Sequence, residues 1–272
     1  MRQKHKSGLS IFVKAFLQKL PKKSIMKYGL HIFSVMLLLV FTCGYKEVQK
    51  NSQPGFALVE LFTSEGCSSC PPADEAIASL AMQNKSNVFI LGFHVDYWDY
   101  LGWKDIYSNA TYSERQRRYA QTFSLNSIYT PQIVVNGSTQ FVGSDKQQLA
   151  STVDIALNGS YHSSIQLSAK ETSDKNIMVN INMEKIVGHT VVHIALIQST
   201  AVSHVQKGEN KGKELRHINI VRDFKTIDQI TNQNTVYLKM PSSLSKNELM
   251  LIAHTQDKNS MQIKDAAKSM IQ

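Results

Sequence analysis

At 272 residues, 42% of them hydrophobic, the chain is long enough for one large domain or two ordinary ones, each with its own core, which excludes disorder as the starting assumption. The formal net charge is +9, but residues 1–43 carry eight basic side chains and no acidic one. Only about one net positive charge is left for the remainder, so the charge does not predict a nucleic-acid partner.

Residues 32–41 form an uncharged apolar run, IFSVMLLLVF, near the N-terminus. Spanning a bilayer takes about 20 such residues, whereas a run of about ten is typical of a signal-peptide core. Met26 and Lys27 stand just before the run, and we expect translation to start at Met26. The alternative interpretation is an uncleaved N-terminal membrane anchor.

The apolar run ends in VFTCG, which resembles a bacterial lipobox, the motif whose cysteine is lipidated and becomes the mature N-terminus. Cys43 is therefore the predicted lipidation site. Residues 1–43 would be the leader, and residues 44–55 a polar linker between the lipid anchor and the folded part. These features predict a membrane-anchored lipoprotein of the cell envelope, or otherwise a secreted or periplasmic protein.

Two apolar runs, residues 56–62 (FALVELF) and 88–95 (VFILGFHV), predict buried strands. Between them, TSEGCSSCPPAD predicts a turn that leads into a helix with apolar positions at Ala76, Ile77 and Leu80. Strand, helix and strand together form a βαβ unit.

The next elements continue an α/β pattern. A capping box at residues 111–114 opens a helix that ends near residue 123. Residues 132–135 and 140–142 predict two strands joined by an Asn-Gly turn, and a capping box at residues 144–147 opens a helix that ends near residue 157. This order of elements is that of the thioredoxin fold with one inserted helical segment, so residues 56–158 are predicted to form a thioredoxin-like α/β domain.

The pattern changes after Gly159, where no convincing helix is found. Six strand-like runs follow, most with alternating apolar and polar residues, at 164–169, 177–183, 191–198, 215–224, 236–240 and 249–254. Many short strands at regular spacing predict an all-β sandwich-like domain over residues 160–272. The longest connection, residues 205–213, is predicted to be a solvated loop.

Cys67 and Cys70 form a CxxC motif between the first predicted strand and helix. One close pair is typical of a redox couple, whereas a disulfide framework has several scattered pairs. The amides and macrodipole of a helix N-terminus stabilise a thiolate, so we predict Cys67 as the attacking thiol and Cys70, one turn further in, as the less exposed resolving thiol. The alternatives are a structural disulfide and half of a zinc site, although zinc would usually need further ligands close in sequence.

Thr130-Pro131 directly precedes the strand predicted at residues 132–135. In thioredoxin-like proteins a cis-proline at this place lies beside the CxxC motif, and the backbone next to it pairs with the chain of the bound partner. We therefore predict a cis Pro131 near Cys67. The alternative is an ordinary trans bond at the start of a strand.

Residues 93–103 (FHVDYWDYLGW) place polar and aromatic side chains at the carboxyl end of the second strand, the edge where α/β sheets bind ligands. A buried acid near a dithiol can accept the proton of the resolving thiol, and Asp96 is the predicted acid. The alternative, weighed equally, is that His94, Asp96 and Asp99 cap and anchor a long loop.

Three runs, VELFTSEGCSSCPPAD, HVDYWDYLGWKDIYSNATYSERQRRYA and YTPQIVVNG, resemble an uncharacterised family of secreted bacterial proteins with a thioredoxin-like fold, domain of unknown function 1223. The run GENKGKELRHINIVRDF resembles the family as well, so the resemblance covers roughly residues 56–257. It implies a fold and a secreted location but no established reaction. By this likeness Cys67, Cys70 and Pro131 correspond to the redox positions of thioredoxin-like folds.

The β-rich half contains a polar segment that could cover the dithiol or bind a partner, although a solvated loop is the favoured interpretation. Its charged residues are His204, Glu209, Arg216, His217 and Arg222.

The leading hypothesis is a thiol–disulfide oxidoreductase without a cofactor, which acts on protein thiols or disulfides outside the cytoplasm. Its predicted site residues are Cys67, Cys70, Pro131 and Asp96. One alternative is a non-enzymatic lipoprotein whose CxxC binds a soft metal such as Cu(I), for which two thiolates suffice. The other is an envelope protein with a static disulfide, which would have a much more negative reduction potential.

Overall fold

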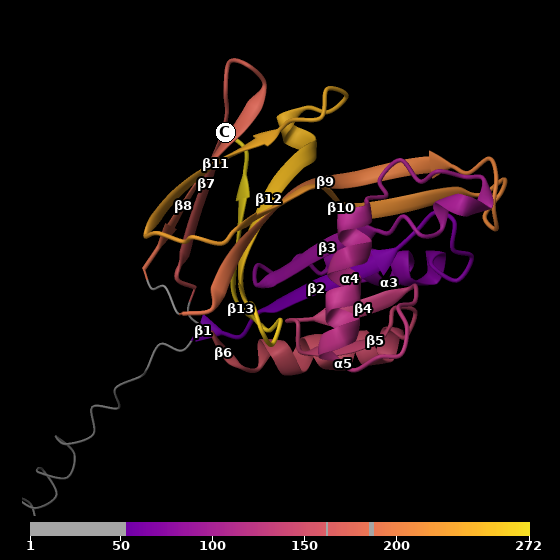
Figure 1. Ribbon diagram of the computed structural model, residues 1–272, viewed down its shortest axis with the longest axis horizontal. Helices are drawn as coiled ribbons and strands as arrows, with labels where there is room; N and C mark the ends of the chain where they lie inside the picture. The colour runs from indigo at the N-terminus through magenta and orange to yellow at the C-terminus, as the bar shows by residue number, and fades with distance from the viewer. Residues whose placement is uncertain (1–52, 162, 185–187) are drawn as a thin grey trace, which may run out of the picture. The chain divides into compact units, whose positions relative to one another are not determined.

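The computed structural model describes residues 53–161, 163–184 and 188–272, and the predicted leader, most of the linker and Cys43 lie outside them (Figure 1). The first three elements are β2 (Ala57–Thr63), α3 (Pro71–Met82) and β3 (Val88–His94). β2 and β3 are parallel, and all their residues are buried. Burial on both faces explains why these two strands are continuous apolar runs in the sequence.

Two helices and a hairpin follow: α4 (Ala110–Thr122), β4 (Gln132–Val135), β5 (Thr139–Val142) and α5 (Lys146–Leu157). Both helices exist where they are predicted, but their capping residues differ. Asn109 caps α4 by accepting the amide of Thr111, and Asp145 caps α5 by accepting the amide of Gln148. Asn and Asp are preferred N-caps, and the two predicted capping boxes therefore start one or two residues away from the true caps.

The second half is almost entirely β-structure, with one short 3₁₀ turn (η2) among its described residues; another short 3₁₀ turn (η1) follows β3. The remaining elements are β1 (Gln53–Pro54), η1 (Asp99–Leu101), β6 (Ser160–Tyr161), β7 (Ile165–Glu171), β8 (Asn176–Met183), β9 (Thr190–His204), β10 (Glu214–Ile227), β11 (Gln233–Lys239), η2 (Lys246–Glu248), β12 (Leu249–Asp257) and β13 (Ile263–Met270). β9 and β10 are much longer than predicted and pair with each other along nearly their whole length.

One mixed sheet of eight strands runs through both halves, in the order β13-β12-β9-β10-β3-β2-β4-β5 (Figure 1). The join is a parallel pairing of β10 with β3, recorded at Ile220 and Gly92. The predicted fold class, a thioredoxin-like α/β domain followed by a β-sandwich, is therefore wrong. The prediction fails because strands from the second half of the chain extend the sheet beyond the edge of β3.

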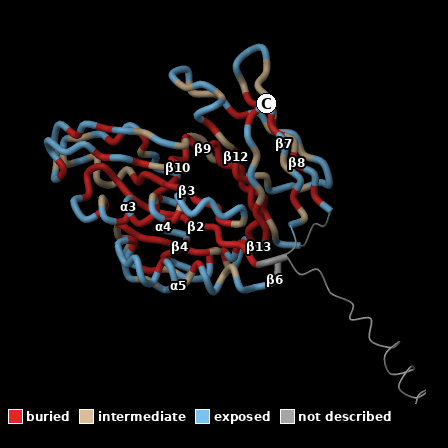
Figure 2. Tube along the Cα trace, turned by 180° about the vertical axis from the view of Figure 1, so that it is seen from behind, coloured by how far each residue is buried: buried red, intermediate tan, exposed pale blue. Residues whose placement is uncertain are grey.

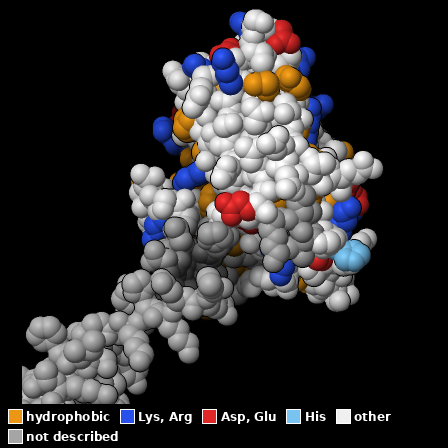
Figure 3. Space-filling view, turned by 90° about the vertical axis from the view of Figure 1, so that its left-hand side faces the viewer, with side chains coloured by type: hydrophobic (Ala, Val, Ile, Leu, Met, Phe, Trp, Pro, Cys, Tyr) orange, Lys and Arg blue, Asp and Glu red, His pale blue; other side chains and the backbone are white. Residues whose placement is uncertain are grey.

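A separate three-stranded sheet, in the order β11-β8-β7, packs on one end of the large sheet. Inward residues such as Ile177, Val179 and Ile181 meet Ile194, Leu196 and Leu251 of β9 and β12. The alternation of buried and partly exposed residues in β8 matches a sheet with one face against a core. In the view of Figure 3, uncharged polar side chains and backbone dominate the centre of the molecule, and lysine and arginine side chains lie around its margin.

The large sheet buries side chains on both faces, and many of its strand residues are coloured as buried in Figure 2. On one face, Val59 and Leu61 of β2 pack against Ile77 of α3 and Val153 of α5. On the other face, Leu58 and Phe62 of the same strand pack with residues of α4, β9, β10 and β12. Side chains alternate across a strand, so the neighbours of each β2 residue follow from its position.

A buried polar network joins α4 to the second of these faces. The side chain of Arg115 donates to Glu60 at 2.6 Å and to Gln256 at 3.0 Å, and Tyr119 donates to Glu60. Gln256 also contacts the ring of His193 at 2.9 Å, and the ring of His254 lies 5.0 Å from that of His193. All these side chains are buried, so the network fixes α4 and three strands in one arrangement.

Candidate functional site

Cys67 and Cys70 are joined by a disulfide in the turn between β2 and α3, with their Cα atoms 5.4 Å apart. The turn is held by two backbone hydrogen bonds of 3.2 Å, from the amide of Cys67 to Ser64 and from the amide of Cys70 to Cys67. Helix α3 begins at Pro71, where the missing amide costs little because the first helical amides have no partner within the helix.

The predicted difference between the two cysteines does not match this geometry. Cys70, not Cys67, is the N-cap of α3, and its carbonyl accepts the amides of Ala73 and Asp74. Both cysteine side chains have 0% of their surface exposed, while Ser68 and Ser69 between them are exposed. The prediction that Cys67 is the more exposed thiol is therefore wrong, and the choice of nucleophile stays a prediction.

The connection between β9 and β10 covers this turn. The side-chain amide of Asn210 donates to the carbonyls of Glu65 and Cys67, each at 2.9 Å, and Asn210 is fully buried. The exposed carboxylate of Glu209 accepts the amide of Ser68 at 2.9 Å. Hydrogen bonding to the side chain and then to the amide of Ser68 lowers the pKa of Glu209. Residues 205–213 are thus not simply the solvated loop that their composition suggests. They complete the surroundings of the disulfide.

A buried histidine lies between two carboxylates next to the disulfide turn. The ring nitrogens of His217, on β10, are 3.4 Å from Glu65 and 3.6 Å from Asp74. These contacts are ion pairs rather than well-aligned hydrogen bonds. Burial alone would lower the pKa of His217, but the two carboxylates outweigh it and raise this pKa to about 10. His217 is therefore an imidazolium at neutral pH.

A second histidine–carboxylate pair supports the first. His94, at the end of β3, contacts Asp105 at 2.6 Å, and its ring lies 4.7 Å from that of His217. Burial would raise the pKa of Asp105, but His94 and two backbone amides hold it below its usual value. One of these amides belongs to Glu65, whose carboxylate accepts the indole N–H of Trp103 at 2.6 Å. The ring and carboxylate positions are thus fixed by neighbours on several elements.

Asp96, the predicted acid, has a different environment. Its carboxylate accepts the hydroxyl of Ser113 at 2.5 Å, and its amide donates to the same hydroxyl at 3.1 Å. Nearby, Asp99 accepts the hydroxyl of Ser108 and the amide of Asp105. No contact recorded among the described residues joins Asp96 to either cysteine. These contacts agree with the alternative interpretation, in which Asp96 anchors the loop to α4.

The Thr130–Pro131 bond is cis, as predicted. Pro131 and Ala73, in the first turn of α3, approach Gly143 so closely that a Cβ there would lie 3.1 Å from the Cβ of each. Trp98 adds a second link, because its indole donates to Thr130 at 2.8 Å and its Cβ packs against Gly66, next to Cys67. The structure therefore brings Pro131 to the cysteine turn.

Sequence reasoning missed Glu65, Asp74 and Asn210 as members of this site and included His217 only in a polar segment. Glu65 and Asp74 flank the CxxC motif, so their nearness to it was a usable signal. Asn210 and His217 come from the other half of the chain, and no local pattern predicts their contact with the turn. Within the described residues, no group of three or more His, Cys, Asp or Glu is arranged to hold a metal ion.

None of the helices in the described ranges is long and apolar enough to cross a membrane. The lipidation site predicted at Cys43 is outside these ranges, as is the predicted start at Met26.

Comparison with known proteins finds a family of unknown function and two similar folds. The family model DUF1223, described as a protein of unknown function, matches residues 58–256. A crystal structure of a protein from Agrobacterium tumefaciens is 27% identical, with a TM-score of 0.59, and the match covers 79% of this chain and 93% of that chain. HBP35 of Porphyromonas gingivalis is 14% identical with a TM-score of 0.54 over 82% and 77% of the two chains, which shows similarity of fold alone. No curated protein matches the chain.

Proposed function

We propose that this chain, which belongs to the DUF1223 family of proteins of unknown function, carries out thiol–disulfide exchange with partner proteins outside the cytoplasm. Cys67 and Cys70 are the reacting residues. The observation that carries the proposal is the place of the disulfide. It lies at the N-terminus of α3, beside the buried His217 and its two carboxylates. A static bridge has no need of a buried ionisable cluster, and perturbed ionisable groups gather at reactive sites.

The disulfide form accepts two electrons from a partner dithiol. A thiolate of the partner attacks one sulfur, the Cys67–Cys70 bond breaks, and the other cysteine leaves as a thiolate that takes up one proton. The second partner thiolate then attacks the mixed disulfide and releases the remaining cysteine, which takes up a second proton. The partner ends as a disulfide and the CxxC motif as a dithiol, and the reverse sequence reduces a partner disulfide.

His217 acts in this proposal as a positioning residue. A thiolate that forms near Glu65 and Asp74 meets two negative charges, which would disfavour it. The imidazolium between these carboxylates offsets part of their charge and holds both side chains in place. The amides at the start of α3 add a favourable interaction with negative charge. Together these groups stabilise a cysteine thiolate at neutral pH.

The proposed location rests on the leader rather than on the fold. The apolar run at residues 32–41 and the cysteine at position 43 support export followed by lipidation. Metabolic labelling with a fatty acid should label the parent protein and not Cys43→Ala, and this substitution should release the protein from the membrane. Equal membrane association of Cys43→Ala, with no label on the parent, would contradict the location.

Trapping of mixed disulfides tests the reaction itself. Cys70→Ser leaves Cys67 able to form a mixed disulfide that no resolving thiol can break, so it should accumulate covalent adducts with partner proteins in the envelope. Cys67→Ser tests the opposite assignment, and the double substitution is the control for adducts at other residues. Adducts with Cys67→Ser alone would reverse the roles of the two cysteines.

The absence of adducts from both single variants would contradict the exchange reaction, provided that both fold. In that case the reduced protein should be tested for Cu(I). Tight uptake that is lost in the double variant would support the metal-binding alternative, and a very negative reduction potential would support a static disulfide.

A further inference from the structure

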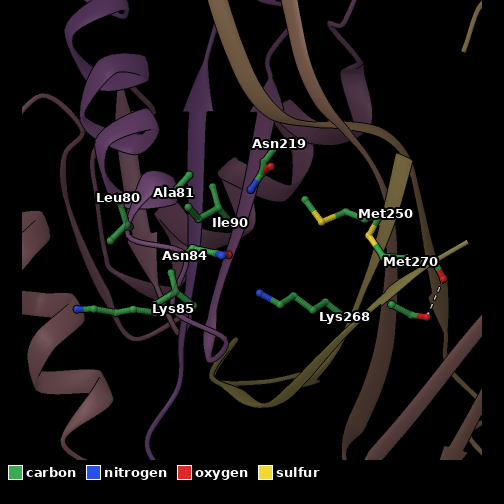
Figure 4. A pocket seen from close by; sticks show the side chains of 11 residues that line it. Leu80, Ala81, Asn84, Lys85, Ile90, Asn219, Met250, Lys268 and Met270 are labelled. Carbon is green, nitrogen blue, oxygen red and sulfur yellow. Dashed lines mark hydrogen bonds between the residues drawn. The ribbon is translucent and has the colours of Figure 1, made fainter. Parts of the chain in front are cut away.

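The large sheet has a gap next to the first half of β3. β10 pairs with β3 only at Ile220 and Gly92, and the backbone of Asn219 is so close that a Cβ on Gly92 would lie 3.2 Å from its carbonyl oxygen. The sheet curls so that β13 comes back towards β3, with the ammonium of Lys268 5.8 Å from the ring of Phe89. Between these strands is a pocket of about 380 Å³ (Figure 4).

Apolar side chains form the walls of this pocket. Leu80 comes from the last turn of α3, Ile90 from β3, and Met250 and Met270 from β12 and β13 (Figure 4). Methionine side chains are flexible and polarisable, and they adapt to ligands of different shape. The volume is at the lower end of the range of small-molecule sites, roughly 300–1,000 Å³, which are also mostly apolar with a few polar groups.

The charged side chains that line the pocket are all basic. Its lining contains two lysines and no aspartate or glutamate. Lys85 points away from the pocket and lies 3.7 Å from Asp154, whereas Lys268 points across it towards the turn that holds Asn84 (Figure 4). Among the described residues no carboxylate lies within ion-pair distance of Lys268. An anionic group in the pocket would therefore meet a lysine whose charge no carboxylate of the described residues neutralises.

Two asparagines of the lining have an unusual backbone. Asn84 has φ +47° and Asn219 has φ +51°, the left-handed region that non-glycine residues seldom occupy. No hydrogen bond to the side-chain amide of either is recorded within the described ranges, and Figure 4 shows both at the pocket. For Asn84 the conformation has a local cause, because this residue directly follows the C-cap of α3, where it is common. The two asparagines therefore contribute polar amides to the pocket rather than evidence of strain.

We propose that this pocket binds a small amphiphile with one carboxylate head and an aliphatic tail, taken from solution. The head would pair with Lys268 and accept hydrogen bonds from the asparagine amides, and the tail would pack on Leu80, Ile90 and Met250. The pocket does not include the cysteines, so the site is independent of thiol–disulfide exchange.

Methionine methyl signals give a direct test, because Met250 and Met270 line the pocket while Met261 is buried away from its lining. The full-length chain, labelled with ¹³C at its methionine methyl groups, is titrated with octanoate, with octyl glucoside as the same tail on a neutral head, and with acetate as the head without the tail. Octanoate should move the signals of Met250 and Met270 and leave that of Met261 in place, and it should bind more tightly than either other probe.

Lys268→Gln should weaken octanoate binding about fivefold, the effect of one partly exposed ion pair. Lys264→Gln is the matched control, since this lysine is exposed on the same strand and is not part of the lining. Unmoved signals of Met250 and Met270 in the wild type would overturn the proposal. So would equal binding of octyl glucoside, an unchanged affinity in Lys268→Gln, or binding that occurs only on anionic phospholipid vesicles.

Discussion

The molecule contains two buried histidine clusters that differ in protonation. The histidine between carboxylates is protonated at neutral pH, and the histidines beside an arginine are neutral. His217 lies between two carboxylates, and its pKa is raised to about 10. His193 and His254 lie beside the cation of Arg115, and burial together with this charge lowers the pKa of both well below the usual value. Equal burial therefore gives an imidazolium in one cluster and neutral rings in the other, because the neighbouring charges differ in sign.

The two clusters also differ in which parts of the molecule they join, because the His217 cluster lies next to the disulfide turn. The Arg115 network joins α4 to the sheet and satisfies most of its polar atoms with hydrogen bonds. In the His217 cluster, one oxygen of Glu65 and both ring nitrogens of His217 lack well-aligned hydrogen bonds, and in the Arg115 cluster both ring nitrogens of His254 lack them as well. The two clusters therefore differ in the sign of the neighbouring charge and not in how completely their polar atoms are hydrogen-bonded.

The largest expected effect is on the structural cluster. Arg115→Met leaves the carboxylate of Glu60 buried without its cation and should lower the free energy of unfolding by about 3–5 kcal/mol, measured by denaturant titration. Arg117→Met, on the same helix in an exposed pair with Glu114, should change it by less than about 1 kcal/mol. Equal effects of the two substitutions would mean that Arg115 is not an essential member of a buried network.

The next effect is the alkaline pH dependence due to His217. Its raised pKa means that the folded protein holds a proton which the unfolded chain releases above about pH 6.5. This contribution to stability is complete below pH 6.5 and is lost as the pH rises through about 10, at up to about 1.4 kcal/mol per pH unit. The loss should be absent in His217→Gln, compared by denaturant titration at each pH. A His217 ring that titrates near pH 6.5 by NMR would contradict the ion pairs.

The dependence of stability on pH below about 6.5 is due to the other cluster, which contains His193 and His254. His193 and His254 have lowered pKa values in the folded protein, so below about pH 6.5 the unfolded chain binds protons that the folded protein excludes. Stability should fall by up to about 1.4 kcal/mol per pH unit for each histidine. His254→Leu should lose part of this dependence between pH 7 and 5, and the exposed His204→Leu should not. Identical profiles for wild type and His254→Leu would show that His254 is not held neutral.

The smallest expected effect concerns the cover of the disulfide. Asn210→Ala removes the donor to two buried carbonyls and should cost about 1 kcal/mol. Because both cysteines are buried, it should also speed reduction of the disulfide by a small thiol. Gln206→Ala, an exposed position of the same connection, is the control for both measurements. An unchanged reduction rate would show that access does not depend on Asn210.

Local features were predictable from the sequence, whereas long-range pairing was not. The CxxC turn, the helix after it and the Asn-Gly hairpin follow from neighbouring residues, and the structure contains them. The cis Pro131 was predicted from its place in the order of elements, and it is present as well. The pairing of β10 with β3 joins strands more than a hundred residues apart, and apolar periodicity does not say which strand extends an edge. The fold class was wrong for this reason, and Asn210 and the acid partners of His217 were missed.

The β9–β10 connection is synthesised after the cysteines, and this order determines when the two thiols are uncovered. Asn210 follows Cys67 by 143 residues, so the cysteines leave the ribosome well before the segment that covers them. At about 5–20 residues per second the interval is roughly seven to thirty seconds. During this interval the two thiols are uncovered and can be oxidised or can react with other thiols. Docking of the β9–β10 connection then buries both sulfurs, so the two thiols are most accessible before the chain is complete.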